Sequence, residues 1–371
     1  MMTPKRHSFA VIGAGVSGAT VASALARVGH SVHVFDKARG PGGRLATRRV
    51  EWVDHHGHAA TTRLDHGALG FTAGNPAFRA SVDMAVRAGC LAEWMSRLAP
   101  GSLPLEEGAM LYVPTPDMPA LSRHLLDGVP VSLSFAVDGL QHGPLGWEVR
   151  AGDLRHASSF DAVVLALPPA QAAPLLNPHR PEWAKHASAT PMQPCWTLMG
   201  IADEPVPESA WDLARPPSGP LAWVSRNDAR PGRAGVPGLA HWVAHAQPGW
   251  SRRHLEQPVT WVQQQLQAAL AECLGRAIDW HHCTVHRWHY ALPDAHGPAP
   301  AAPCWWDAAQ GLGVCGDFLG NCGVEGAWLS AQALSAALLQ TFSGGSDTPT
   351  ARAVVEAAPA AAQRAPPRCA A

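Results

Sequence analysis

Lysine is scarce in this sequence of 371 residues, which has it only at Lys5, Lys37 and Lys185. Arginine supplies the other basic residues, so 28 Lys and Arg nearly balance 29 Asp and Glu, and the formal net charge is -1. A chain so close to neutral has no long-range field that would draw it to nucleic acid or to an anionic membrane. We therefore expect neither as a partner.

Metal-binding and membrane-spanning patterns are also missing. The eight cysteines form no CxxC pair, and none has the spacing of zinc ligands. No apolar run approaches the roughly 18 residues that cross a bilayer, and residues 1–7 are too short and polar for a signal peptide. We expect a soluble cytoplasmic protein without a metal site, and the sequence indicates no oligomeric state.

A βαβ unit opens the chain. Residues 8–12 form an apolar strand, residues 19–28 an Ala-rich helix that Gly29 ends, and residues 31–35 a second strand. The helix provides the right-handed crossover that two parallel strands need.

The turn between this strand and helix reads GAGVSG, a GxGxxG motif in its required context. The first glycine permits the tight turn, the second lets the backbone approach a pyrophosphate, and the third lets helix and strand pack closely. An acidic residue at the end of the second strand can accept hydrogen bonds from a ribose diol. The predicted contacts are Gly13, Gly15, Val16, Ser17, Gly18 and Asp36.

A second glycine-rich stretch, KARGPGGR, follows at once. Glycines gather where a backbone must approach a ligand, and an arginine there offers a planar cation to a phosphate. The alternative is a flexible loop with a solvated arginine. The candidate contacts are Lys37, Gly42, Gly43 and Arg44.

Further elements follow the same patterns. We expect a hairpin from residues 50–53 and 59–64, a helix at 76–88 capped by Asn75, a helix at 117–126, and a strand at 129–135. Later strands, most of which contain a Trp, are expected at 146–150, 161–167, 195–201, 221–225, 239–246 and 311–315. Two long helices are expected at 258–274 and 324–341.

Several motifs resemble one known family. Residues 40–49 (GPGGRLATRR) are similar to the second dinucleotide signature of the amine oxidase superfamily, especially its renalase branch. Residues 65–72 (DHGALGFT) resemble the renalase segment that runs past the flavin. Residues 316–320 and 324–330 resemble its C-terminal flavin motif, and residues 287–293 (RWHYALP) are also similar. The matches run in order from residue 8 to about residue 341.

The resemblance implies FAD as the cofactor. An aspartate after the last strand could accept from ribityl hydroxyls, and the N-terminus of the last helix could stabilise negative charge on the reduced flavin; the alternative is an ordinary capped helix. The implied contacts are Gly67, Ala68, Val137, Ala166, Gly316, Asp317, Glu325, Gly326 and Ala327.

The fold class that the resemblance implies is α/β. A Rossmann-type FAD-binding domain is interleaved with a mixed-sheet substrate domain that covers the flavin ring, as in p-hydroxybenzoate hydroxylase. The predicted segments are 1–73, 115–180 and 284–342 for the FAD domain, 74–114 and 181–283 for the substrate domain, and 343–371 for a disordered tail.

Two groups of histidines invite a metal assignment. His55, His56 and His58 fall in a hairpin turn, where polar residues are expected. His281, His282 and His286 lie on or beside a strand, where successive side chains point to opposite faces, so the three would not converge. We assign both groups structural roles.

Large aromatic residues could line the substrate pocket. The candidates are Trp196, Trp242 and Trp288, together with His66 in the loop that resembles a flavin contact. Like Trp223, these indoles could equally be core packing, and His66 could simply orient its loop.

The family resemblance implies an oxidase that restores NAD(P)+ from the 2- and 6-dihydro isomers of NAD(P)H. Hydride would pass to flavin N5 and dioxygen would reoxidise the flavin, giving hydrogen peroxide. One alternative is an amine oxidase acting on a small amine, and another is a non-catalytic FAD-binding protein. Anaerobic bleaching of the flavin distinguishes these three functions: dihydronicotinamide isomers, amines or neither should reduce it.

Overall fold

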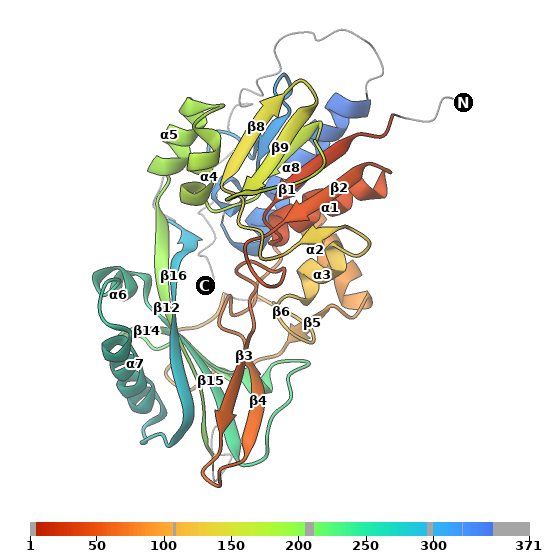
Figure 1. The fold of residues 1–371 in the computed structure, drawn as a ribbon. Helices are drawn as coiled ribbons and strands as arrows, with labels where there is room; N and C mark the ends of the chain where they lie inside the picture. The colour runs from red at the N-terminus through yellow and green to blue at the C-terminus, as the bar shows by residue number, and fades with distance from the viewer. Residues whose placement is uncertain (1–4, 107–108, 205–210, 295–299, 321, 344–371) are drawn as a thin grey trace. The chain divides into compact units, whose positions relative to one another are not determined.

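A computed structural model describes residues 5–106, 109–204, 211–294, 300–320 and 322–343. The chain divides into two compact units (Figure 1). The first contains the described residues up to Gly43, Leu121–Pro191 and those from Pro293 on, and the second contains Arg44–Ala120 and Met192–Leu292. The segments 44–73, 115–120 and 284–292, predicted for the FAD domain, thus lie in the second unit, and residues 181–191, predicted for the substrate domain, lie in the first. The predicted disordered tail falls, after Ser343, outside the described residues.

The first unit is built on a six-stranded sheet. Its order is β17 (Trp305–Asp307), β18 (Leu312–Val314), β11 (Ala162–Leu165), β1 (Ser8–Ile12), β2 (Ser31–Phe35) and β7 (Val131–Ser132). All neighbours are parallel except the edge pair of β17 and β18. Of the inner strands, β11 and β18 have no polar side chain and β1 has only Ser8, because a parallel sheet is covered on both faces. This arrangement confirms the predicted Rossmann topology.

Helices α1 (Val16–Arg27) and α8 (Gly323–Ser343) pack together on one face of this sheet (Figure 1). Successive strand residues alternate between the two faces. Phe9 and Val11 therefore join the core beneath α1 and α8, whereas Ala10 and Ile12 join the opposite core.

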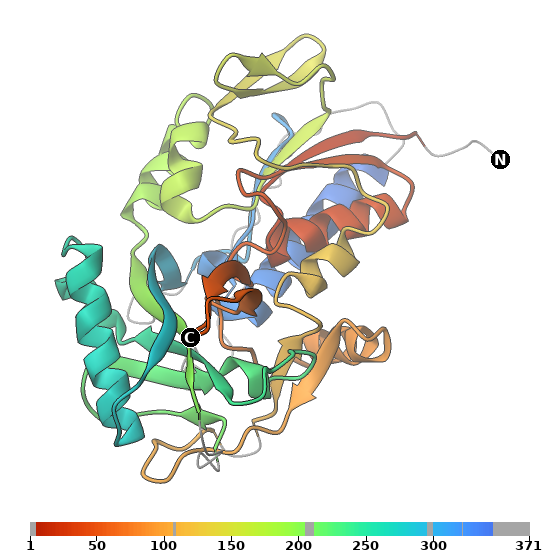
Figure 2. The ribbon, with the colours of Figure 1, turned by 60° about the horizontal axis from the view of Figure 1, so that its bottom comes forward.

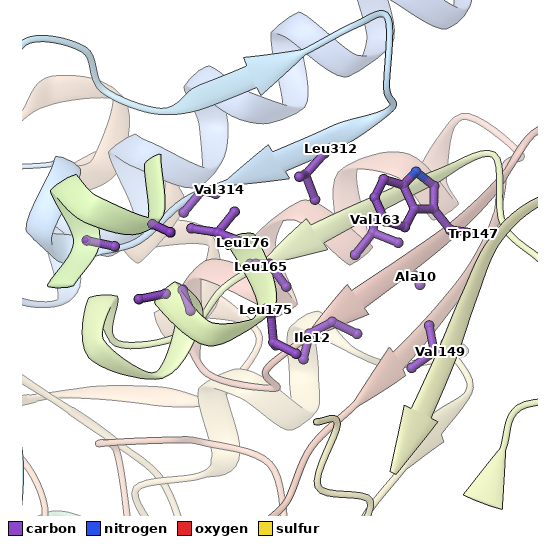
Figure 3. Close-up of a cluster of buried hydrophobic side chains, with 14 of the residues drawn as sticks. Ala10, Ile12, Trp147, Val149, Val163, Leu165, Leu175, Leu176, Leu312 and Val314 are labelled. Atoms are coloured by element: carbon purple, nitrogen blue, oxygen red, sulfur yellow. The ribbon is translucent and has the colours of Figure 1, made fainter. Parts of the chain in front are cut away.

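The opposite core of the first unit lies beneath α4 (Pro169–Leu176), α5 (Pro181–Ala189) and a small sheet of β8 (Gly139–Gly143), β9 (Gly146–Ala151) and β10 (Leu154–Arg155). Figure 3 shows Trp147 from β9 and Leu176 from α4 pointing toward Val163 and Val314 of the large sheet. Trp147 is fully buried, and its Nε1 donates to the carbonyl of Gln310 at 2.8 Å.

The second unit is built on a five-stranded sheet. Its order is β13 (Leu213–Ala214), β14 (Leu221–Arg226), β15 (Leu239–Ala246), β12 (Met192–Asp203) and β16 (Trp280–Pro293). Helix α7 (Val259–Leu274) covers one face with Val262, Leu266 and Leu270. The hairpin of β3 (Arg48–Val53) and β4 (Ala59–Leu64) packs on Met199 and Ile201, which point the other way from Leu198. Figure 2 shows α7 lying along the five-stranded sheet.

Shorter elements complete both units. In the second, α2 (Pro76–Arg87) is capped as predicted, since the Asn75 side chain accepts from the backbone N–H of Ala77 at 2.9 Å. The remaining elements are β5 (Leu91–Trp94), β6 (Leu111–Pro114), α3 (Ala120–Leu125), η1 (Asn227–Ala229), α6 (Pro248–Arg253) and η2 (Asp317–Leu319).

Two elements correct the sequence prediction. The strand expected at 129–135 is only Val131–Ser132, because Ser134 adopts a left-handed φ of 54° that ends the extended conformation. His281, His282 and His286, expected on or beside a strand, lie on the 14-residue strand β16; its bounds are not predicted, because its run of His, Arg and Trp shows no apolar alternation. It lies at an edge of its sheet, where such a pattern is tolerated. No helix among the described residues is long and apolar enough to span a membrane.

The core of Figure 3 gives the first prediction. Leu176 is fully buried in α4, so we expect Leu176→Ala to lower the free energy of unfolding by about 2–5 kcal/mol. Leu145 is 85% exposed in the β8–β9 turn, and Leu145→Ala should change it by less than about 0.5 kcal/mol. Urea denaturation followed by circular dichroism measures both, and equal losses would contradict this assignment of the core.

Candidate functional site

The GxGxxG turn is packed too closely for any side chain at its first and third glycines. Gly13 has a φ of 108°, and a Cβ there would overlap the carbonyl oxygen of Ala166. A Cβ on Gly18 would overlap the carbonyl oxygen of Gly13. Both glycines are therefore required to bring α1 against β1 and the end of β11, as the sequence predicts.

The middle glycine has a different neighbour. A Cβ on Gly15 would meet only the Cα of Gly43, at 3.9 Å, and Gly43 itself has a left-handed φ of 58°. The backbone N–H of Gly42 donates to the carbonyl of Ala14 at 2.9 Å. The two glycine-rich stretches thus meet backbone to backbone, with an open approach at Gly15.

The N-terminus of α1 fits a diphosphate. Its N-cap is Gly15, no side chain caps its first N–H groups, and its first turn, which includes Val16 and Ser17, has no acidic residue. The N–H groups and the positive end of the helix dipole therefore suit an anion. The Asp36 carboxylate accepts from the backbone N–H of Ala14 at 2.7 Å and of Ala38 at 2.8 Å. Asp36 thus holds both turns in place, and its contact with a ribose remains a prediction.

The C-terminal motif adjoins the same helix. The Ser17 hydroxyl donates to the carbonyl of Ala327 at 3.1 Å, which ties the start of α1 to the first turns of α8. The backbone N–H of Gly316 donates to the Ser330 hydroxyl at 3.0 Å. The structure therefore brings the predicted contacts from both ends of the sequence to neighbouring turns. Asp317 is buried in η2, and Glu325, Gly326 and Ala327 lie in the first turns of α8.

The remaining predicted FAD contacts of the first unit are Ala166, Val137 and Lys37. Ala166 follows β11, and its N–H donates to the carbonyl of Ile12 at 2.8 Å, so it lies beside the glycine turn. Val137 lies between β7 and β8, partly buried against the core of α4 and α5. Lys37 is exposed at the end of β2.

In the second unit, the predicted flavin loop pairs with the chain at Arg44. The N–H of Ala68 donates to the Arg44 carbonyl at 2.9 Å, and the N–H of Gly67 donates to the Ala46 carbonyl at 3.1 Å. A Cβ on Gly67 would overlap the Arg44 carbonyl oxygen, so only glycine fits there. The Arg44 guanidinium donates to the Ala291 carbonyl at 3.0 Å, and its contact with a phosphate remains a prediction.

A buried ionic network fixes this loop. The Asp65 carboxylate is fully buried and accepts from the Thr47 hydroxyl at 2.6 Å, from Arg230 Nη1 at 3.2 Å and from Arg233 Nε at 2.8 Å. Burial lowers the pKa of Arg230 to about 10, so it stays charged at neutral pH. Two guanidinium groups thus face one carboxylate, and the network has net positive charge.

His66 and His245 are held neutral beside the same loop. Burial, reinforced by His286, Arg48 and His245, lowers the pKa of His66 to about 3. Burial also lowers the pKa of His245 to about 4, and its Nε2 bonds the Gly67 carbonyl at 2.6 Å, which makes Nε2 the protonated nitrogen.

The indole candidates divide into two groups. Trp196 and Trp242 are 1% and 0% exposed inside the core beneath α7, which favours the packing alternative for both. Trp288 is only partly buried; its ring stacks on His66 with centroids 5.2 Å apart, and its Nε1 donates to the His66 carbonyl at 2.9 Å. Of the three, Trp288 remains the pocket candidate, together with His66.

Sequence reasoning missed Arg48, Arg230, Arg233 and His245. Arg48 lies within the motif at residues 40–49 but was not singled out there, and no motif marks the other three, because each acts through a partner far away in the chain. Arg230 and Arg233 meet Asp65 across more than 160 residues, and His245 meets Gly67 across 178.

The parallel sheet, the glycine turn and the uncapped helix define a dinucleotide-binding protein of Rossmann type. Residues 11–85 match the model of NAD(P)-binding Rossmann-like domains, and residues 90–339, more than half of the chain, match that of flavin containing amine oxidoreductases. The chain therefore belongs to the flavin containing amine oxidoreductase family. It is an FAD-dependent oxidoreductase, in agreement with the cofactor and enzyme class expected from the sequence.

Solved structures share the fold at low sequence identity. A proposed protoporphyrinogen oxidase from Exiguobacterium sp. 255-15 has a TM-score of 0.65 at 11% identity, covering 91% of this chain and 99% of that one. Cyclohexylamine oxidase from Brevibacterium oxydans IH-35A has 0.61 at 14%, covering 91% and 99%. A variant of putrescine oxidase has 0.62 at 13%, covering 91% and 100%. At these identities the similarity shows the fold alone.

The glycine turn gives a prediction that separates folding from binding. We expect Gly15→Ala to fold normally, since its Cβ meets nothing closer than 3.9 Å, but to weaken FAD binding at least about tenfold by obstructing the approach of the diphosphate. Gly18→Ala should instead destabilise the protein, because its Cβ overlaps Gly13. FAD titration and thermal melts measure both effects. Unchanged FAD affinity in folded Gly15→Ala would contradict this site.

The buried imidazoles give a pH dependence. The folded pKa of His245, about 4, lies below its ordinary value of 6.5, so the unfolded chain binds the extra proton between these values. Stability is therefore full above pH 6.5 and falls toward pH 4, with about 2 kcal/mol lost at pH 5. His245→Gln keeps a donor for Gly67 and should lose less between pH 7 and pH 5 in urea denaturation. An unchanged slope would contradict a buried neutral His245.

Proposed function

We propose that this enzyme is a renalase-like oxidase that converts the 2- and 6-dihydro isomers of NAD(P)H to NAD(P)+. We also propose that its two units correspond to the FAD and substrate domains of the p-hydroxybenzoate hydroxylase type. Bound FAD would supply the hydride acceptor and pass the electrons to dioxygen, giving hydrogen peroxide. The motifs at residues 40–49, 65–72 and 316–330 support this assignment by resemblance.

The observation that carries the proposal is the positive character of the region around His66. Of the groups that lower the pKa of His66 after burial, Arg48 is the one that carries a charge at neutral pH, and no carboxylate acts against it. Arg48 also lowers the pKa values of His282 and His286. The neighbouring carboxylate of Asp65 is outweighed by Arg230 and Arg233. Such a field attracts the diphosphate of a dinucleotide and repels an ammonium ion.

The protonation state of His66 agrees with this chemistry. An imidazole with a pKa of about 3 is a poor acceptor of protons at neutral pH and cannot serve as an efficient general base. Removal of hydride from a ring carbon of a dihydropyridine needs no base. The roles that remain for His66 and Trp288 are to form an apolar aromatic surface, on which a flat ring can stack, and to restrict water.

The family assignment supports one alternative, oxidation of a small amine. Cyclohexylamine oxidase and putrescine oxidase share this fold. Anaerobic stopped-flow at the flavin absorbance band separates the two proposals. The dihydronicotinamide isomers should bleach the flavin within seconds, and amines should not; bleaching by amines alone would overturn our choice.

Arg48 gives a sharper test of the charged region. Arg48→Gln should raise KM for the dinucleotide isomers about tenfold, the effect of losing roughly one charge-assisted contact, with kcat nearly unchanged. Arg49 is the matched control, since it is the next residue of β3, is exposed and, within the described residues, forms an ion pair with Glu51 at 3.8 Å. Equal KM values for the two variants would contradict a phosphate-binding role for Arg48.

A further inference from the structure

A cluster of nitrogen and oxygen donors lies in the second unit, among residues that neither the flavin motifs nor the region around His66 includes. His55 is in the turn of the β3–β4 hairpin, Asp203 ends β12 and His281 is near the start of β16. One ligand atom from each lies within 4.8 Å of the other two. These residues are 148 and 78 positions apart in the sequence, so only the fold brings them together.

The atoms of this cluster point at one another. His281 Nε2 is 2.7 Å from Asp203 Oδ1, and His55 Nε2 is 3.5 Å from Asp203 Oδ2. The two imidazole rings have centroids 3.8 Å apart. A fourth donor is at hand, because Asp279 Oδ1 lies 3.7 Å from His55 Nε2.

The surrounding packing holds the donors in place. The hairpin packs on the sheet through Val50, Trp52 and Leu64, and the Trp52 ring contacts the His281 ring edge to face at 5.4 Å. The backbone N–H of Asp203 donates to the Asp279 carbonyl at 3.0 Å, which fixes the ends of β12 and β16 side by side. The site is therefore largely preformed.

We propose that His55, Asp203 and His281 bind one divalent transition-metal ion, with Asp279 as the fourth ligand. Imidazole nitrogen and carboxylate oxygen are ligands of Zn²⁺ and its neighbours, and a tetrahedral ion with bonds of about 2.0–2.1 Å needs donors roughly 3.3 Å apart. The separations of 3.5 and 3.7 Å lie close to that value. The 2.7 Å between His281 Nε2 and Asp203 Oδ1 is a hydrogen-bond distance, which would widen by about 0.6 Å around a bound ion. Two carboxylates and two neutral imidazoles also balance the charge of a divalent cation.

The bound ion would join the hairpin to the ends of two strands of the five-stranded sheet. It would bind the folded unit and not the unfolded chain, so it would raise thermal stability by an amount that grows with the free metal concentration relative to its Kd. The role is structural, and it is independent of the substrate proposed above.

The test uses purified, tag-free holoprotein, dialysed against chelator and titrated with Zn²⁺ by isothermal calorimetry. We expect one saturable site per chain and a rise in Tm of at least about 2 °C at saturation. Removing even an indirect partner of a metal ligand costs about tenfold to a hundredfold in affinity, so His55→Ala and His281→Gln should each weaken binding at least about tenfold.

The turn itself supplies the matched control. His56 is exposed in the same turn but is not one of the clustered residues, so His56→Ala should bind zinc like the unaltered protein. The His55 side chain is 47% exposed, so His55→Ala should fold even if His281→Gln does not. The proposal is overturned if the unaltered protein shows no saturable zinc binding, or if His55→Ala and His56→Ala bind zinc equally well.

Discussion

The close approach of backbone to backbone at the first glycine turn is the constraint on which the first unit depends. Neither Gly13 nor Gly18 has room for a single added carbon, and the space is filled by the carbonyl groups of Ala166 and Gly13. This contact lets α1 start directly beside β1 and β11 with its first N–H groups uncapped. The same geometry that makes the fold compact therefore produces an anion-binding end of a helix. Gly15, where the contact is loose, is the position that function rather than packing explains.

In the second unit, buried charged groups hold a loop in place. The loop from Asp65 to Ala68 is fixed by a buried carboxylate with two guanidinium partners and by the His245 imidazole. A buried ion pair of this kind adds little net stability, but losing one partner leaves an uncompensated buried charge. It specifies one loop conformation, and its excess positive charge adds to the field around His66. We therefore propose that the same ionic network fixes the loop conformation and favours an anionic substrate.

How much the sequence predicts depends on whether the information is local. The βαβ unit, the β3–β4 hairpin, the Asn75 cap and helices α7 and α8 follow from short patterns, and the structure has them close to their expected bounds. The bounds of strand β16 do not follow from a short pattern, because an edge strand needs no apolar alternation. The sequence also gives no sign that the two histidine groups lie close together. The two groups lie in segments far apart in the sequence, and only the packing of the hairpin on the sheet brings His55 to His281.

The most direct test of the central claim is a titration of the apoprotein with FAD in the presence and absence of ADP. We predict one FAD per chain and competition by ADP, since the ADP half of the cofactor would occupy the glycine turn and the N-terminus of α1. A colourless protein with no saturable FAD binding, or FAD binding that ADP does not displace, would contradict it.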